Sequence, residues 1–344
     1  MKAFLLAALL AVPAAAKTRE KNLLKEFDLG KTEDRIRLAP ALGHMKDKKA
    51  VDALLNALDV KRSSPRETAA IVDALGAAGD PRAAVELASG VDYLRSMTLQ
   101  LGELPAHLQV LRVKLLEALS RVGGEQAVSI LEEAINDKDP RVVEEAVRGL
   151  GRLQDKNVVG ALQQLAAQGG DMTQAVIEAL ADIGDKRATS TLEQGLAGTD
   201  KFVEVESAYA LARLGRKDMI GRLEGALKND PGTEKVGILA AYYLAKMDKT
   251  SGLAHLETLM KKSDSGYGVL AADALGKSGN PRAVLPLVEA AKAEDSSVRL
   301  SVARGLGFLG GSRALTALKV LREDSNPGVR NAALMSLAEL GETD

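Results

Sequence analysis

The sequence predicts an all-α protein, an α-solenoid of stacked helical hairpins, and three regularities support this. A leucine that ends a helical segment recurs ten times, mostly at intervals of 30 to 33 residues. In all nine complete segments another leucine follows twelve residues later, and in seven of the ten a glycine follows four residues later. A fixed period of this length indicates a repeat array whose units bury their apolar faces by stacking.

Each segment reads as a first helix, a tight turn and a second helix, most clearly from Ala271 to Leu287. The leucines that end the first helices, called anchor leucines below, are Leu42, Leu75, Leu119, Leu150, Leu180, Leu211, Leu244, Leu275, Leu306 and Leu337. Their partners in the second helices are Leu54, Leu87, Leu131, Leu162, Leu192, Leu223, Leu256, Leu287 and Leu318. We expect each anchor to face its partner across the hairpin. The residue before the anchor, usually Ala or Gly, should let neighbouring helices approach closely.

Local signals mark the helix ends. The glycine four residues after the anchor suits a left-handed C-cap, which glycine adopts without Cβ strain. Ser64-Pro65-Arg66-Glu67 predicts a capping box with Pro at the first helical position, and Asp139 and Asp230 each precede a proline as N-caps.

The repeat period also predicts how the chain is divided into segments. Residues 17–31 are expected to form a capping helix, and residues 32–344 nine hairpins and a C-terminal half repeat. The interval from Leu75 to Leu119 is 44 residues, which places an insertion at about 89–107. It is too apolar for a solvated loop, so we expect a longer second helix or a short extra helix. That element either packs on the solenoid or projects toward a partner through Tyr93 and Met97.

Residues 1–16 read as a secretory signal that is cleaved after Ala16. Lys2 supplies a positive charge, and the apolar run from Ala3 to Val12 is too short to span a bilayer. No Cys follows the cleavage point, so a lipid anchor is not expected. We therefore expect an exported protein, periplasmic or extracellular. The alternative is a frayed apolar helix of a cytosolic protein.

Composition excludes several classes of function. The 46 basic and 47 acidic residues nearly balance, so nothing pulls the chain toward nucleic acid or anionic lipid. The absence of Cys excludes disulfides, thiolate metal sites and Cys nucleophiles. His44, His107 and His255 lie at three different repeat positions without a second ligand at helical spacing. We expect no catalytic residue, cofactor or metal site, and hence no enzyme.

The repeat motif resembles the HEAT repeat, in the short bacterial form also found in phycobilisome lyases. Asp80-Pro81-Arg82-Ala83 and Asn280-Pro281-Arg282-Ala283-Val284 match its turn best, and Val298-Arg299 and Val329-Arg330 match the start of its first helix. The resemblance covers roughly residues 33–344. It implies a right-handed solenoid whose second helices line the concave face.

The resemblance also bears on chemistry. HEAT-like hydroxylases carry metal-binding His-Glu pairs, whereas here the three histidines are followed by Met45, Leu108 and Leu256. The resemblance therefore implies that the ligands for that activity are missing.

One residue past the partner leucines lies an acidic row: Glu132, Gln163, Glu193, Glu224 and Glu257. Helices about 8–10 Å apart would align these side chains. They are either good helix formers on an exposed face or a stripe that binds a basic peptide, a protein segment or a cation. Another shared position, at the start of the second helix, serves either the turn and inter-repeat hydrogen bonds, as we expect, or the rim of the groove: Arg82, Arg187, Arg282 and Arg313.

Tyr209 and Tyr242 lie two residues before their anchors in adjacent repeats, where other repeats mostly carry charged residues. We expect an exposed pair that forms a contact hot spot, since tyrosine is enriched in such places. The alternative is packing between repeats.

The leading hypothesis is a non-enzymatic exported scaffold that binds a protein partner through the concave face of the solenoid. It needs no cofactor, nucleic acid or membrane insertion. Two alternatives are an enzyme-associated or chaperone-like subunit related to HEAT-like lyases, and a structural envelope protein that self-associates.

Overall fold

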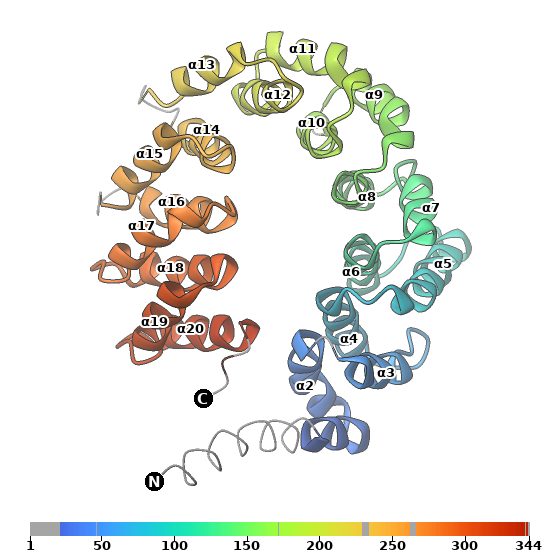
Figure 1. The fold of residues 1–344 in the computed structure, drawn as a ribbon. Helices are drawn as coiled ribbons and strands as arrows, with labels where there is room; N and C mark the ends of the chain where they lie inside the picture. Colours follow the sequence, from blue (N-terminus) through green and yellow to red (C-terminus); the bar gives the residue numbers. More distant parts are fainter. Residues whose placement is uncertain are drawn as a thin grey trace, which may run out of the picture. The chain divides into compact units, whose positions relative to one another are not determined.

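The fold is given by a computed structural model that describes residues 21–45, 47–170, 172–228, 234–261, 266–340 and 342. Throughout these residues the regular structure is helical, and the helices follow one another as stacked pairs (Figure 1). The predicted all-α solenoid of helical hairpins is therefore confirmed. The chain divides into two compact units, one ending at Leu162 and the other beginning at Gln163. Each is described by itself.

The described part of unit 1 starts with a helix over residues 21–29, in which Phe27 is fully buried. Its labelled elements are α2 (Thr32–Met45), α3 (Lys48–Ala57), α4 (Pro65–Ala78), η1 (Pro81–Ala83), α5 (Ala84–Leu101), α6 (Ala106–Val122), α7 (Glu125–Ala134), α8 (Pro140–Leu153) and η2 (Lys156–Val158). The boundary between the units falls within α9 (Val159–Gln168).

Unit 2 continues the same alternation. Its elements are α10 (Met172–Ile183), η3 (Lys186–Ala188), α11 (Thr189–Ala197), α12 (Lys201–Arg213), α13 (Asp218–Gly225), α14 (Glu234–Lys246), α15 (Thr250–Met260), α16 (Tyr267–Lys277), η4 (Pro281–Ala283), α17 (Val284–Ala290), α18 (Ser296–Leu309), α19 (Ser312–Leu321) and α20 (Pro327–Glu339). The even-numbered helices from α2 to α20 are thus the first helices, and the odd-numbered ones from α3 to α19 are the second helices.

The leucine pattern forms the core of both units. All ten anchor leucines and all nine partner leucines are at most 3% exposed. The glycines four residues after the anchors also behave as predicted: the six within the described residues have φ between 64° and 104°. Gly341, the seventh, lies outside them. The periodic positions therefore fix both the packing and the turn of each hairpin.

Small residues bring successive first helices into close contact. A Cβ added at Gly276 of α16 would lie 2.4 Å from the Cα of Gly305 on α18, and one at Gly43 of α2 would lie 2.8 Å from the Cα of Ala74 on α4. When the helices of one layer lie closer together than those of the other layer, the stack bends toward the more closely spaced layer. Within unit 2 the even-numbered helices α10, α12 and α14 accordingly lie on the inner side of the bend (Figure 1). This corrects the expectation that the second helices line the concave face.

The described helix caps agree with those predicted from the sequence, except at Glu67. Ser64 accepts a hydrogen bond from the Glu67 backbone N at 3.2 Å, and Asp139 caps α8 through the Arg141 backbone N. The Glu67 side chain does not close a capping box. It accepts hydrogen bonds from Thr32 and Arg35 of α2 instead, so it joins two neighbouring first helices. The predicted cap at Asp230 lies outside the described residues.

Arg82 and Arg282, two of the four arginines at the starts of second helices, connect adjacent repeats as expected, and Arg187 pairs with Asp185 in its own turn. Arg82 pairs with Asp80 in its own turn and with Asp52 of the preceding second helix. Arg282 donates to Asp248 at 3.1 Å and to Thr250 at 3.1 Å in the preceding repeat. These guanidinium groups hold one turn against the next.

The long interval before Leu119 is filled mainly by an extended second helix. α5 runs for 18 residues to Leu101 and ends at Gly102, which has a φ of 80°. α6 then begins at Ala106. The residues at about 89–107 are thus largely a continuation of α5.

Candidate functional site

Three tyrosines meet where α12 packs on α14. The ring of Tyr209 stacks on the ring of Tyr243 with centroids 4.1 Å apart, and Tyr242 is tilted against Tyr243 at 5.0 Å. Tyr209 is only 3% exposed and Tyr242 is half-buried, so the expectation of an exposed Tyr209–Tyr242 pair is wrong. The physical reason is Tyr243, which occupies the position before the anchor where most repeats have Ala or Gly. Its ring is buried against Tyr209 in the seam between the two helices.

Cations border this tyrosine cluster. The Lys246 Nζ lies 5.6 Å from the Tyr209 ring centroid and 5.7 Å from that of Tyr242, within cation–π range. Asp182 lies 3.8 Å from Arg213 and 3.9 Å from Lys246. Burial raises the pKa of both Tyr242 and Tyr243 above the usual value. The phenols therefore stay protonated at neutral pH and offer hydrogen bonds and ring faces rather than a nucleophile.

The inner face of unit 2 is defined here by the residues two before and two after each anchor leucine. They are Glu178, Asp182, Tyr209, Arg213, Tyr242, Lys246, Asp273, Lys277, Arg304, Phe308, Met335 and Glu339. Phe308 is 67% exposed and Met335 is 63% exposed. Aromatic residues, Met and Arg are the types enriched at protein interfaces. Sequence reasoning missed Phe308 and Met335, although their register relative to the anchors could have identified them once the inner layer was known.

The acidic row lies on second helices, and its members in unit 2 have internal partners. Gln163 donates to the Arg187 carbonyl at 3.1 Å, Glu193 pairs with Arg216 at 3.0 Å, and Glu224 accepts from Ser251 at 2.9 Å. Each of these contacts reaches the next second helix or the turn before it. Glu257 pairs with Lys261 on its own helix at 2.7 Å. Gln163, Glu193 and Glu224 thus tie successive repeats together, and binding of the row to a partner stays a prediction.

Glu132, the member of the row in unit 1, is exposed on α7. Also in unit 1, Tyr93 and Met97 are half-buried on α5, with the Lys61 Nζ 5.4 Å from the Tyr93 ring centroid. Leu99, close to the end of α5, is 84% exposed. Partner contact by these residues also stays a prediction.

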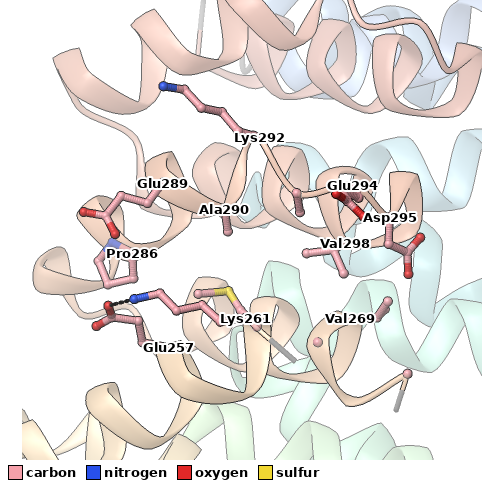
Figure 2. A pocket seen from close by; sticks show the side chains of 14 residues that line it. Glu257, Lys261, Val269, Pro286, Glu289, Ala290, Lys292, Glu294, Asp295 and Val298 are labelled. Carbon is pink, nitrogen blue, oxygen red and sulfur yellow. Dashed lines mark hydrogen bonds and ion pairs between the residues drawn. The ribbon is translucent and has the colours of Figure 1, made fainter. Parts of the chain in front are cut away.

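A cleft of about 400 Å³ opens in unit 2 between α15 and α17, bordered by the starts of α16 and α18. Figure 2 shows Glu257, Lys261 and Glu289 toward one end of it, and Glu294 and Asp295 toward the other. Met260 and Val298, each 6% exposed, form part of its apolar floor. No single motif of the sequence marks this cleft.

The described ranges of the chain hold no group of three or more His, Asp or Glu side chains arranged to bind a metal ion. His44, His107 and His255 lie apart on α2, α6 and α15. Nor do the described helices include one that is long and apolar enough to cross a membrane.

Comparison with known proteins agrees with the geometry. The family model described as HEAT repeats matches residues 107–172 and 269–338, and the model of the PBS lyase HEAT-like repeat matches residues 34–59. The chain is a HEAT-repeat protein. The resemblance to the HEAT repeat is thereby confirmed.

Relatives of this HEAT-repeat protein include enzymes. It is 31% identical over 190 residues to deoxyhypusine hydroxylase from Bos taurus, an alignment that covers 55% of this chain and 57% of the hydroxylase. The chain thus spans little more than half the length of that curated relative.

Two solved structures resemble the fold. Human deoxyhypusine hydroxylase in complex with glycerol gives a TM-score of 0.37 at 21% identity, over 76% of this chain and 99% of the hydroxylase. The complex of CpcE and CpcF of phycocyanin lyase from Nostoc sp. PCC7120 gives a TM-score of 0.41 at 21% identity, over 83% of this chain and 92% of that chain.

Proposed function

We propose that this HEAT-repeat protein is a non-enzymatic scaffold that binds a protein partner on the inner face of unit 2. The observation that carries the proposal is the exposure of Phe308 and Met335 on the inner face. Phe308 lies two residues after its anchor leucine, as Lys246 does, and Met335 lies two residues before its anchor, as Tyr242 does. A large exposed aromatic ring beside Arg and Met side chains has the composition of an interface core. Stacked first helices present one inner-face pair of side chains per repeat, so an extended partner segment can contact several repeats at once.

Site-specific photocrosslinking tests this proposal. A photoreactive benzoylphenylalanine is placed at position 308 or at position 335, and the protein is irradiated in an extract of its source cells. Val320 is the matched control, because it is 70% exposed but lies on the second helix α19. We expect one discrete adduct from both inner-face positions and none from position 320. Equal labelling at all three positions, or no adduct at 308 and 335, would contradict the proposal.

We also propose that the protein is exported and processed after Ala16. The support is the charge, apolar run and small residues of positions 1–16, which lie outside the described residues. The mass of the protein isolated from source cells should correspond to a chain that begins at Lys17. An intact chain beginning at Met1 in the cytoplasmic fraction would argue against export.

A further inference from the structure

An arginine–aspartate pair recurs between adjacent repeats. Arg112 and Arg299 each lie seven residues before an anchor leucine, and each pairs with the aspartate 25 residues further on, Asp137 or Asp324. The Arg299 Nε and Nη2 atoms lie 2.7 and 2.9 Å from the two carboxylate oxygens of Asp324. The guanidinium therefore fills the space between the start of one first helix and the turn before the next.

Both pairs are largely shielded from solvent. The Arg112 and Asp137 side chains are 7% and 17% exposed, and those of Arg299 and Asp324 are 13% and 10% exposed. The inter-repeat space at this position thus accommodates a guanidinium group, and the repeat geometry supplies an acidic partner for it.

Among the described residues this pair is found in two repeats, and the repeat containing α16 is one of those without it. Gly268 stands seven residues before Leu275 in place of the arginine, and Ala293 stands 25 residues further on in place of the aspartate. Both residues line the cleft of about 400 Å³. The cleft therefore opens at the position that Arg112 and Arg299 fill in their own repeats.

The lining of the cleft suits a cation with an apolar stem. Met260 and Val298 supply buried apolar surface, whereas four carboxyl groups and two amino groups give the rim a net negative charge (Figure 2). Glu257 is paired with Lys261 at 2.7 Å. Within the described residues, the side chains of Glu289 and Glu294 have no hydrogen-bond or ion-pair partner.

The first turns of α16 and α18 also border the cleft, and the positive end of a helix dipole opposes a bound cation. Arg299 shows that this repulsion is overcome in the same fold. Its guanidinium is held at the start of α18 by the Ala293 and Glu294 carbonyls at 2.8 and 2.9 Å and by Asp324.

We propose that the cleft between α15 and α17 binds an arginine side chain of a partner polypeptide, which enters the space that Arg112 and Arg299 fill in their own repeats. The planar guanidinium would meet Glu289 at one end of the cleft, and its three methylene groups would cover Met260 and Val298. The cleft is separate from the inner face, and only the source of the arginine rests on the proposed scaffold function.

The test uses the full chain and a small probe. N-acetyl-L-arginine amide is titrated against protein with labelled Met and Val methyl groups, and the Met260 and Val298 signals are followed by NMR. N-acetyl-L-citrulline amide, which has nearly the same shape without the charge, is the matched probe. We expect saturable shifts with the arginine compound and at least about threefold weaker binding of the citrulline compound. No saturable shift, or equal response to both compounds, would overturn the proposal.

Two variants locate the binding. Gly268→Arg combined with Ala293→Asp restores the pair seen at Arg299 and Asp324, and should abolish the shifts while raising the melting temperature. A Cβ at Gly268 would lie 3.2 Å from the Val298 Cγ2 and 3.7 Å from the Leu259 and Met260 carbonyl oxygens, so Val298 has to shift slightly to accommodate it. Should the double variant fold poorly, Glu289→Gln leaves the volume unchanged and should weaken binding about threefold. Unchanged affinity in Glu289→Gln would refute the proposed charge contact.

Phe308→Ser separates the two proposals. It should remove partner crosslinking on the inner face and leave the response to N-acetyl-L-arginine amide intact. Loss of arginine binding in this variant would place the bound arginine outside the cleft and overturn the inference.

Discussion

At the scale of single residues, Tyr243 replaces a small residue in the tightest part of the repeat. Its 4% exposure and its stacking on Tyr209 make it a packing element of the α12–α14 seam. We expect Tyr243→Ala to lower the free energy of unfolding by about 3 kcal/mol or more, because a large ring leaves a cavity. Urea denaturation measures this, with the half-buried Tyr93→Ala as a milder control. Equal losses in both variants would contradict the assigned packing role.

The same tyrosine should make the free energy of unfolding fall as the pH rises into the alkaline range. Burial raises the pKa of Tyr243 above its usual value of about 10. The unfolded chain therefore loses this proton first as the pH rises, which favours unfolding by up to about 1.4 kcal/mol per pH unit above pH 10. Tyr243→Phe should flatten the decline of stability between about pH 10 and 11. Parallel alkaline profiles for wild type and Tyr243→Phe would show that this residue does not contribute.

Asp324 should make the stability of the fold depend on pH in the acidic range. Hydrogen bonding from Arg299 lowers the pKa of Asp324, so its stabilising contribution is lost as the pH falls through that lowered pKa. Asp324→Asn should reduce the free energy of unfolding at neutral pH by about 3 kcal/mol, since a shielded guanidinium loses its partner. The control is Glu144→Gln, which removes the exposed pair with Arg148 at 2.8 Å and should cost less than about 1 kcal/mol. Similar costs for the two changes would be the contrary result.

At the scale of helices, the effect of replacing a glycine depends on what the neighbouring helix places opposite it. Gly276→Ala forces α16 and α18 apart, because the new Cβ would lie 2.4 Å from the Gly305 Cα. We expect a net loss of about 1–3 kcal/mol, even though Ala favours a helix by about 1 kcal/mol. Gly221→Ala on α13 adds a Cβ with nothing within 4 Å and should stabilise by up to about 1 kcal/mol. Chemical denaturation of both variants compares them directly, and equal effects would contradict the close contact assigned to Gly276.

The helices were predictable because their determinants are local and periodic. The twelve-residue spacing between Leu75 and Leu87 predicts a hairpin by itself, and both side chains are fully buried. The layer that lies inside the bend was not predictable, since it depends on three-dimensional spacing between glycines of different repeats. The Tyr209–Tyr243 stack and the cleft at Gly268 could not be predicted from the sequence either, because they also depend on the three-dimensional arrangement of different repeats. Each arises where one repeat departs from the others, and the consequence depends on what the neighbouring repeat places opposite.

At the scale of the whole molecule, a repeat array lacks the cooperativity of a compact core. Each helical pair contacts mainly its neighbours, so a local loss of stability need not spread along the chain. The chain also divides into two compact units. We therefore expect the units to unfold in separable steps.

Tyrosine fluorescence can isolate unit 2, because four of the five tyrosines lie there and Tyr93→Phe removes the remaining one. In that background, Leu75→Ala in unit 1 and Leu275→Ala in unit 2 are matched changes at fully buried anchors, each costing about 2–5 kcal/mol locally. Leu275→Ala should lower the urea midpoint of the fluorescence transition. Leu75→Ala should leave that midpoint in place while shifting part of the helical circular-dichroism signal to lower urea. A fluorescence midpoint that moves equally in both variants would mean that the array unfolds as one cooperative body.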